Sequence, residues 1–352
     1  MTKRFRIFPS RYLSFILPTV ILILVPFATA LAAQTTRVAV LGATGKLGRQ
    51  TIQQFLDREI PVRCLIRPPS LEKIPTEFKD SPLFEMVAGE LLADSSRSDD
   101  GIYRDDLVTP SAELLECIKG CQGVVSCYGA TRSTKISDLS RNPEDTDPTH
   151  AKQINYRSMI ALVAACNAIN NGDGKSKINH IVRITGKGED PKNIFSILIN
   201  GLGSFAKAWN YQGEVVLRTS LANSNNDDGD GSIGYTIIRP GIMKEEDFSK
   251  DNLILADDGG NDLQVTPVSY SQIGSLMVDI LLLAGDGRIS TSKQNNKVTL
   301  AAMSSSDNDS KTSLVEKIAA LRNDRCVISV VYICASALTI GENALPGFSH
   351  HG

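Results

Sequence analysis

The chain has 352 residues, of which 42% are hydrophobic and 22% charged, with 27 Gly and 15 Pro. This composition excludes collagen, coiled coil and wholesale disorder, and the length allows two domains or one large α/β domain with additions. The 37 basic and 39 acidic residues give a net charge of −2, so a dedicated nucleic-acid binder is not expected.

Residues 1–36 predict a signal peptide or a signal anchor. They hold four basic residues and no acid, and the apolar run Phe15–Ala33 ends in small residues. This order of basic, apolar and small residues is typical of a secretory signal peptide. The alternative is an uncleaved anchor, because a run of this length nearly crosses the roughly 30 Å hydrocarbon core. Membrane contact would then run through residues 12–36.

Both interpretations place the folded part in the secretory pathway or endomembrane system, either secreted or anchored, because the basic N-terminus stays cytosolic. The alternative is a plastid that is reached through a signal peptide followed by a transit peptide. Few residues separate the Ala-rich end of the apolar run from the first predicted strand at Val38, which leaves little room for a transit peptide.

After Arg37, short β-branched runs alternate with longer amphipathic stretches. The expected strands are Val38–Leu41, Val62–Arg67, Phe84–Ala88, Gly123–Tyr128, Ile178–Thr185, Tyr235–Ile238 and Lys297–Met303. The expected helices are Lys46–Arg58, Pro110–Lys119, His150–Asn170, Asn193–Ser220 and Tyr270–Ala284. Apolar strands that alternate with helices predict an α/β fold, a Rossmann-like doubly wound parallel sheet with a small C-terminal substrate-side extension.

Four inserts are polar and low in complexity, and we expect them to be mobile surface loops because they bury too little surface to become ordered. They are Ala93–Asp100, Ser133–Asp147, Asn223–Gly231 and Ser304–Lys311. Residues 304–352 read as a polar linker followed by an apolar tail. The tail's run Cys326–Ile340 is too short for a confident membrane span. Cys117 and Cys121 lack an accompanying Cys/His pair, so no metal site is expected.

The glycines between the first strand and the first helix predict a dinucleotide-binding turn. Gly42 allows the tight turn, Gly45 lets the backbone approach a pyrophosphate, and Gly48 lets the helix pack closely on the strand. Free N–H groups at the helix start then face the phosphates. The candidate residues are Gly42, Ala43, Thr44, Gly45, Lys46, Leu47 and Gly48, spaced G-x-x-G-x-x-G rather than G-x-G-x-x-G.

The end of the second strand favours NADP over NAD. An NAD site usually offers a carboxylate about 20 residues after the glycines, to hold the ribose 2′-hydroxyl. The run Val62–Pro68 contains no acid, whereas Arg67 lies 19 residues after Gly48. Its guanidinium can pair with a 2′-phosphate, although a solvated surface arginine is the alternative.

From Arg37 to Ala284 the sequence resembles the atypical short-chain dehydrogenase/reductase (SDR) superfamily, in its NmrA-like NAD(P)-binding branch. The similar segments are GATGKLGR at 42–49, Arg67, Val87–Leu91, Val124–Ala130, Ile181–Thr185, Gly213–Arg218 and Gly234–Gly241. The resemblance implies an NAD(P)-binding domain over residues 37–303. It also implies cofactor contacts at Glu90, Leu91, Tyr128, Gly129 and Pro240, with Glu90 in place of the branch's usual Asp.

The catalytic pattern of the main SDR branch is absent. That branch uses Tyr-x-x-x-Lys, in which the lysine lowers the pKa of the tyrosine that exchanges a proton with the substrate. No tyrosine here has Lys four residues later, and the position where relatives carry that Lys holds Asn210. Tyr211 or Lys207 could substitute, and Thr185 could bind a carbonyl substrate, although packing roles are the alternative for each.

The sequence therefore predicts an NADPH-dependent oxidoreductase that lacks the usual dyad. The alternative is a non-catalytic NADP(H)-binding module that acts as a redox sensor or a membrane-complex assembly factor. The expected partners are the dinucleotide and an unknown small molecule. The apolar residues of Asn193–Ser220 would suit an apolar molecule or membrane contact, although a packed helix is the alternative.

Overall fold

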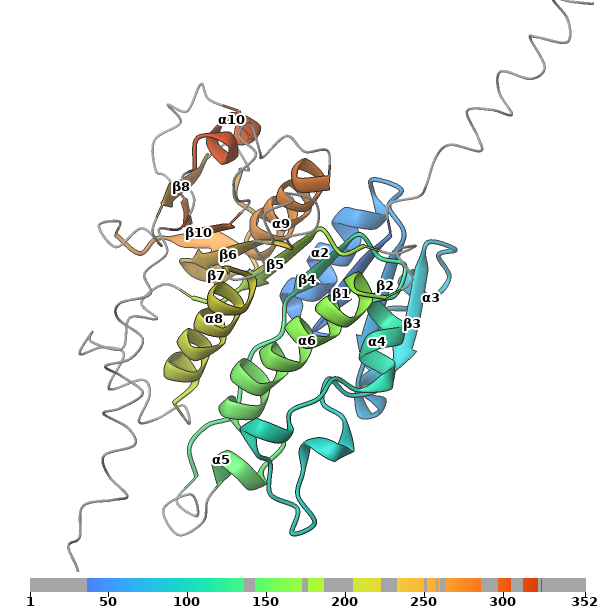
Figure 1. Ribbon diagram of the computed structural model, residues 1–352. Helices are drawn as coiled ribbons and strands as arrows, with labels where there is room; N and C mark the ends of the chain where they lie inside the picture. Colours follow the sequence, from blue (N-terminus) through green and yellow to red (C-terminus); the bar gives the residue numbers. More distant parts are fainter. Residues whose placement is uncertain are drawn as a thin grey trace, which may run out of the picture. The chain divides into compact units, whose positions relative to one another are not determined.

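The computed structural model describes residues 37–135, 143–172, 177–186, 205–222, 233–249, 252–257, 259, 264–285, 297–304, 313–321 and 324. They form an α/β fold around one large sheet (Figure 1). The predicted signal or anchor, the first part of the predicted helix Asn193–Ser220 and the apolar run Cys326–Ile340 lie outside the described residues.

The large sheet has eight strands in the order β3-β2-β1-β4-β5-β6-β10-β8. The strands are β1 (Val38–Leu41), β2 (Val62–Ile66), β3 (Phe84–Ala88), β4 (Gly123–Ser126), β5 (His180–Ile184), β6 (Gly234–Pro240), β8 (Leu253–Asp257) and β10 (Lys297–Ser304). All neighbours are parallel except β10 and β8. The predicted doubly wound sheet is confirmed, and its order reverses between β1 and β4. In such sheets the ligand binds outside the carboxyl ends of the strands at this switch point.

Helices cover both faces of the sheet. On one face α2 (Lys46–Leu56) packs with α9 (Tyr270–Gly285), and on the other lie α4 (Ala112–Ile118), α6 (Ser158–Asn170) and α8 (Ala206–Ala222). In Figure 1 these last three helices lie in front of the sheet. Alternate residues of a strand point to opposite faces, and accordingly Val38 and Val40 join one apolar cluster while Ala39 and Leu41 join the other. The predicted burial of β1 on both faces is confirmed.

The predicted helix His150–Asn170 is not uniform. It contains a π-helical segment, Lys152–Arg157, which runs directly into α6. Such wide turns are rare and occur frequently at functional sites. Here the segment contacts the start of α8 through Asn155.

Several short elements had no counterpart among the predicted ones. Besides β8, they include the parallel pair β7 (Ile242–Lys244) and β9 (Pro267–Ser269), and the helices α3 (Thr76–Lys79), α5 (Pro143–Thr146) and α10 (Leu314–Ala319). Three 3-10 turns lie at Pro68–Lys73, Asp94–Ser96 and Asp105–Leu107. α10 falls within the predicted polar linker, yet it packs on the sheet: Ile318 is buried in the core and Lys317 donates to the carbonyl of Leu253.

Ala93–Asp100, predicted as a polar surface loop, is mostly exposed, but backbone hydrogen bonds fix one buried residue within it. Ser96 is fully buried, and its hydroxyl accepts a hydrogen bond from the backbone N–H of Thr109 at 3.1 Å. Arg97 pairs with Tyr103 in an antiparallel bridge. Hydrogen bonds to backbone therefore anchor this polar insert in place of apolar burial. Asn223–Gly231 and most of Ser304–Lys311 lie outside the described residues.

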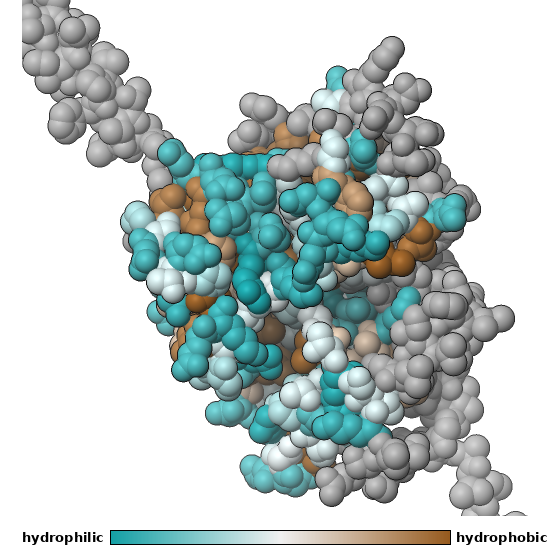
Figure 2. Space-filling view, turned by 180° about the vertical axis from the view of Figure 1, so that it is seen from behind, coloured by the Kyte–Doolittle hydropathy of each residue, from teal (hydrophilic) through white to brown (hydrophobic). Residues whose placement is uncertain are grey.

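No helix among the described residues is long and apolar enough to cross a membrane. The side seen in Figure 2, opposite to the view of Figure 1, is largely hydrophilic with apolar patches between the polar side chains. Within the described part of the chain, the large apolar side chains with substantial exposure are Met86, Phe205, Ile242, Ile254 and Val265.

Candidate functional site

The turn between β1 and α2 requires glycine at two positions. Gly42 has a φ of +86°, and a Cβ there would lie 2.7 Å from the backbone nitrogen of Tyr128. A Cβ on Gly48 would lie only 2.2 Å from the carbonyl oxygen of Gly42. That same oxygen accepts the N–H of Gly45 at 3.1 Å, which closes the turn. The tight turn and the close packing predicted for Gly42 and Gly48 are therefore what the structure has.

The start of α2 is free of side-chain caps and acids. Gly45 is the N-cap residue, its cap has no side-chain hydrogen bond, and the first turn of the helix contains no acidic residue. The first N–H groups of a helix have no partner within the helix, and the helix dipole makes this end positive. Gly45 and Lys46 are exposed at this end of the helix, so an anion such as a phosphate could approach these N–H groups.

The other residues of the turn contribute in different ways. Ala43 and Leu47 are buried in the core, so only their backbones can face a ligand. Thr44 is half-buried. Lys46 is exposed and its Nζ lies 2.5 Å from Oε1 of Glu245, a contact that raises the pKa of Lys46 and lowers that of Glu245. Lys46 would have to exchange this partner to reach a phosphate.

Arg67 and Glu90 lie at the carboxyl ends of neighbouring strands. β2 and β3 pair in parallel with Ile66 opposite Ala88, and each residue follows shortly after its strand. Both side chains are exposed. Partial burial raises the pKa of Glu90, while the positive charges of Arg67 and Arg97 oppose that rise. The structure thus brings Arg67 and Glu90 near each other at the ends of β2 and β3, and the half-buried Leu91 follows Glu90.

Tyr128 and Gly129 follow β4 and adjoin the glycine turn. The close approach of Gly42 to the Tyr128 backbone joins the two predicted cofactor segments across the switch point. Nothing lies within 4 Å of a Cβ built on Gly129, which is exposed. Pro240 is the buried last residue of β6, opposite Ala302 of β10.

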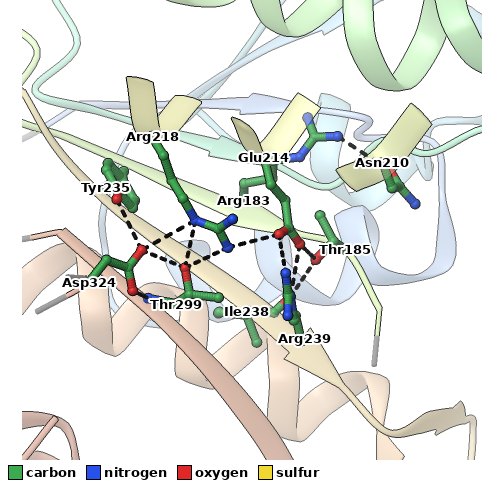
Figure 3. A network of polar contacts seen from close by, with 10 residues as sticks. All are labelled: Arg183, Thr185, Asn210, Glu214, Arg218, Tyr235, Ile238, Arg239, Thr299 and Asp324. Atoms are coloured by element: carbon green, nitrogen blue, oxygen red, sulfur yellow. Dashed lines mark hydrogen bonds and ion pairs between the residues drawn. The ribbon is translucent and has the colours of Figure 1, made fainter. Parts of the chain in front are cut away.

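Thr185, directly after β5, is tied to a buried carboxylate. Its hydroxyl donates to Oε1 of Glu214 at 2.7 Å. Glu214 is fully buried on α8 and also accepts hydrogen bonds from Arg239 and Arg218 (Figure 3). Burial would raise the pKa of Glu214, but the guanidinium of Arg239, together with Arg218 and Thr185, lowers it below its usual value. Glu214 is therefore ionised at neutral pH, and its carboxylate accepts the hydrogen bond that the Thr185 hydroxyl donates.

The same network reaches the C-terminal part of the described chain. Oδ2 of Asp324 accepts hydrogen bonds from the hydroxyls of Thr299 at 2.6 Å and Tyr235 at 3.0 Å, and Oδ1 accepts the N–H of Thr299. Arg218 lies between the two acids, 2.9 Å from Glu214 and 3.4 Å from Asp324 (Figure 3). Nothing in the sequence pattern indicated that Asp324 joins this network.

On α8, Asn210, Glu214 and Arg218 follow at intervals of four and share the face towards the sheet. Oδ1 of Asn210, at the position where relatives carry Lys, accepts a hydrogen bond from Nη2 of Arg183 at 3.3 Å. Tyr211 is half-buried and lies about 100° around the helix from Asn210. Among the described residues no hydrogen bond joins Tyr211 to Thr185, so the structure does not bring the two predicted catalytic residues into contact.

Two buried residues that the sequence reasoning missed meet beside Tyr128. Asn155 is fully buried: its Oδ1 accepts the N–H of Ala130 at 3.0 Å, and its Nδ2 donates to the carbonyl of Ala206 at 3.2 Å. Arg183 is also fully buried and donates to the backbone carbonyl of Asn155 at 3.0 Å. The available signal was an arginine between the apolar residues Val182 and Ile184 of a buried strand.

A cysteine adjoins this region of the chain. Burial raises the pKa of Cys127, the residue before Tyr128, to about 12, so it remains an un-ionised thiol at neutral pH. No group of three or more His, Cys, Asp or Glu side chains suited to a metal occurs in the part of the chain that the structure describes.

Comparison with known proteins defines the fold. No protein-family model matches the chain. An uncharacterized chloroplastic protein from Arabidopsis thaliana is 37% identical over 60 residues, 17% of this chain and 21% of that protein. The match therefore spans about a fifth of that relative's length.

Among solved structures, a short-chain dehydrogenase/reductase from Veillonella parvula, also solved in complex with NADP, is similar at a TM-score of 0.50 and 14% identity, over 79% of this chain and 99% of that one. An oxidoreductase from Lactococcus lactis is similar at a TM-score of 0.50 and 9% identity, over 80% of this chain and 94% of that one. The chain thus has the fold of the NAD(P)-binding SDR proteins, as the resemblance implied.

Proposed function

We propose that this chain binds NADP(H) at the turn between β1 and α2 and acts as an NADPH-dependent reductase. The observation that carries the proposal is the uncapped start of α2, without an acid in its first turn, behind a turn in which Gly42 and Gly48 leave no room for side chains. The fold of this chain is shared with a reductase that has been solved with NADP, which supports the same cofactor class.

The residues at the strand ends fit a dinucleotide. The N–H groups at the start of α2 would hold the pyrophosphate. Glu90 and Leu91 would border the adenine, while Tyr128, Gly129 and Pro240 would border the nicotinamide end. When bound, the nucleotide supplies the hydride.

Arg67 supports NADP over NAD, because it is exposed at the end of β2, where a fork of N–H donors can pair with a 2′-phosphate. Glu90 lies in its vicinity, and burial raises the pKa of that carboxyl. Replacement of Arg67 by Gln should therefore weaken NADPH binding by about tenfold, the loss of one charge-assisted contact, and leave NADH binding unchanged. Arg49 is exposed on the first turn of α2. Arg49→Gln is therefore the matched control, because it removes the same charge without removing the proposed contact of Arg67 with the 2′-phosphate.

The proton step is the open part of this function. The Thr185 hydroxyl donates its hydrogen bond to the ionised Glu214. Thr185 could therefore deliver a proton to a substrate only after breaking that hydrogen bond. Its lone pairs remain able to accept a hydrogen bond from a substrate or a water. Tyr211 is the alternative donor. The hydrogen bond from Thr185 to Glu214 favours a second candidate function. This is a non-catalytic NADP(H)-binding module that senses redox state or assists the assembly of a membrane complex.

One assay separates the two functions. The full chain is mixed with NADPH and a panel of aldehydes, ketones and quinones, and absorbance is followed at 340 nm. A reductase lowers the absorbance with at least one carbonyl class, and the Tyr211→Phe and Thr185→Val variants then identify the proton donor by loss of turnover with NADPH binding retained. Tight NADPH binding without loss of absorbance would refute the reductase and support the module.

For the location we propose the secretory or endomembrane system, with the chain secreted or anchored through residues 12–36, and a plastid reached through a signal peptide as the alternative. The basic, apolar and small-residue order of residues 1–36 supports the proposal. The N-terminal sequence of the native protein, measured together with its membrane or soluble fraction, tests it. A mature N-terminus near residue 34 indicates cleavage, and an intact Met1 in the membrane fraction indicates an anchor.

A further inference from the structure

Buried polar atoms without partners gather beneath the carboxyl ends of β4 and β5. Among the described residues eight buried side-chain nitrogen and oxygen atoms lack a hydrogen-bond partner, and four of them belong to Ser126, Tyr128 and Arg183. Ser126 and Arg183 face each other in register across the two strands. The guanidinium carbon of Arg183 lies 5.8 Å from the centre of the Tyr128 ring.

These three side chains point to the same side of the sheet. Residues two apart on a strand share a face, so Ser126 and Arg183 follow Val124 and Ile181, which belong to the apolar cluster on the side of α6 and α8. The partly buried Tyr128 packs against that same cluster. The unpartnered atoms Ser126 Oγ, Tyr128 OH, Arg183 Nε and Arg183 Nη1 therefore form one group, which we call the buried donor cluster.

Arg183 differs from the other buried arginines in having no carboxylate partner among the described residues. Arg157 pairs with Asp105 and Asp145, and Arg239 pairs with Glu214. Arg183 is fully buried, yet its Nη2 has only the neutral acceptors Asn155 O and Asn210 Oδ1. An uncompensated buried charge is strongly unfavourable, so a negatively charged partner at this position would stabilise the protein.

The chemistry of the buried donor cluster selects an anion. A guanidinium can only donate hydrogen bonds, and a serine or tyrosine hydroxyl can donate one as well. A carboxylate only accepts and offers about four lone-pair sites on two oxygens. A group of this kind can accept from the free N–H groups of Arg183 and from the two hydroxyls, and it also compensates the buried positive charge, which a neutral amide or ester does not.

The position of the cluster connects it with the proposed cofactor site. Tyr128 contributes the hydroxyl from its side chain, while its backbone nitrogen adjoins Gly42 of the nucleotide-binding turn. A ligand whose carboxylate reached Arg183 past the Tyr128 ring would therefore lie beside the predicted nicotinamide end. Arg183 has no exposed surface, so a ligand would reach it only if the half-buried Tyr128 ring or the first turn of α8 moved aside.

We propose that Arg183, with the hydroxyls of Tyr128 and Ser126, binds the carboxylate of a substrate whose carbonyl group lies at the nicotinamide. The substrate class is then a carboxylate-bearing aldehyde or ketone. The meeting of carbonyl and cofactor rests on the proposed function, whereas the carboxylate site itself does not.

The test uses two probes that share the aldehyde and the ring, 4-formylbenzoate and its uncharged methyl ester, which is larger by one methyl group. Both are used in calorimetric titrations of the full chain with and without NADP+. The oxidised nucleotide prevents turnover during the titration. We expect 4-formylbenzoate to bind at least tenfold more tightly than the ester. In Arg183→Gln this preference should disappear, while Arg58→Gln, which removes an arginine that pairs with Asp279 on the opposite face of the sheet, should retain it.

Two hydroxyl variants keep the test decisive if Arg183→Gln does not fold. Tyr128→Phe and Ser126→Ala should each weaken binding of the carboxylate by about tenfold or more, the loss of one hydrogen bond to a charged group, and leave the ester unaffected. Equal affinity of the wild type for both probes, or a preference that survives in Arg183→Gln, would overturn the proposal. Absence of heat with NADP+ would refute the nucleotide site alone, because the nucleotide-free titrations test the carboxylate site independently.

Discussion

The same methyl group added at Gly45 or at Gly48 should have opposite consequences. A Cβ on Gly48 would lie 2.2 Å from the carbonyl oxygen of Gly42 and 2.9 Å from its carbon, both of them backbone atoms. At Gly45 the nearest atom to a Cβ would be the same carbonyl oxygen, at 3.4 Å, which is ordinary contact. Gly48→Ala should therefore damage the fold, and Gly45→Ala should damage only the binding of a phosphate.

The magnitudes follow from these distances. The Gly48 methyl falls about 1.2 Å short of the 3.4 Å at which ordinary contact begins. No side-chain rotation can relieve a clash with backbone, so we take the upper end of overpacking costs, about 3 kcal/mol. Alanine in a helix interior returns about 1 kcal/mol, which leaves a net loss of about 2 kcal/mol. At the N-cap, replacement of Gly45 by Ala costs at most about 1 kcal/mol.

Urea unfolding of the full chain measures the loss of stability in Gly48→Ala. Titration with NADPH measures the loss of phosphate binding in Gly45→Ala. We expect Gly48→Ala to lower the free energy of unfolding by about 2 kcal/mol. Gly45→Ala should unfold within about 1 kcal/mol of the wild type but bind NADPH at least tenfold more weakly, because its methyl group separates the pyrophosphate from the N–H groups of α2. Equal stability of both variants, or NADPH binding unchanged in Gly45→Ala, would refute the reasoning.

Two further predictions concern buried charges. Glu214→Gln should lower the free energy of unfolding by about 3–5 kcal/mol, because it leaves Arg239 buried without its carboxylate, and a variant within 1 kcal/mol of the wild type in urea unfolding would contradict the network. His180 is fully buried, and burial lowers its pKa from 6.5 to about 3, so the folded state resists the proton that the unfolded state binds below pH 6.5. From pH 7.5 to 5.5 the wild type should therefore lose about 1.4 kcal/mol of stability through this residue, and His180→Gln should lack that component; identical pH dependence in both proteins would exclude it.

The β1–α2 turn could be predicted because its contacts are local. Gly42, Gly45 and Gly48 lie within seven residues, and the positive φ of Gly42 and the close approach of Gly48 are properties of that short segment. The continuous apolar run of β1 likewise predicted a parallel sheet, because a strand that is covered on both faces is apolar at every position. The chain order of the strands then follows the usual doubly wound arrangement.

The buried networks could not be predicted because their partners are distant in the chain. Tyr235 and Asp324 are 89 residues apart, and Arg218 and Thr299 are 81 apart. Strand β8 was missed for another reason: it is an antiparallel edge strand in which only Leu253 is buried, so its pattern does not resemble that of the central strands. Arg183 inside β5 could be seen as an anomaly, but its neighbours Asn155 and Asn210 could not be identified.

The central claim is that the N–H groups at the start of α2 hold the diphosphate of NADP(H). Calorimetric titration of the full chain with NADPH and NADH, for the wild type and for Gly45→Trp, tests it most directly. The account predicts heat with NADPH, weaker binding of NADH, and no binding of either by Gly45→Trp, whose indole would occupy the place of the phosphates. No heat with either nucleotide in the wild type, or unchanged binding by Gly45→Trp, would contradict it.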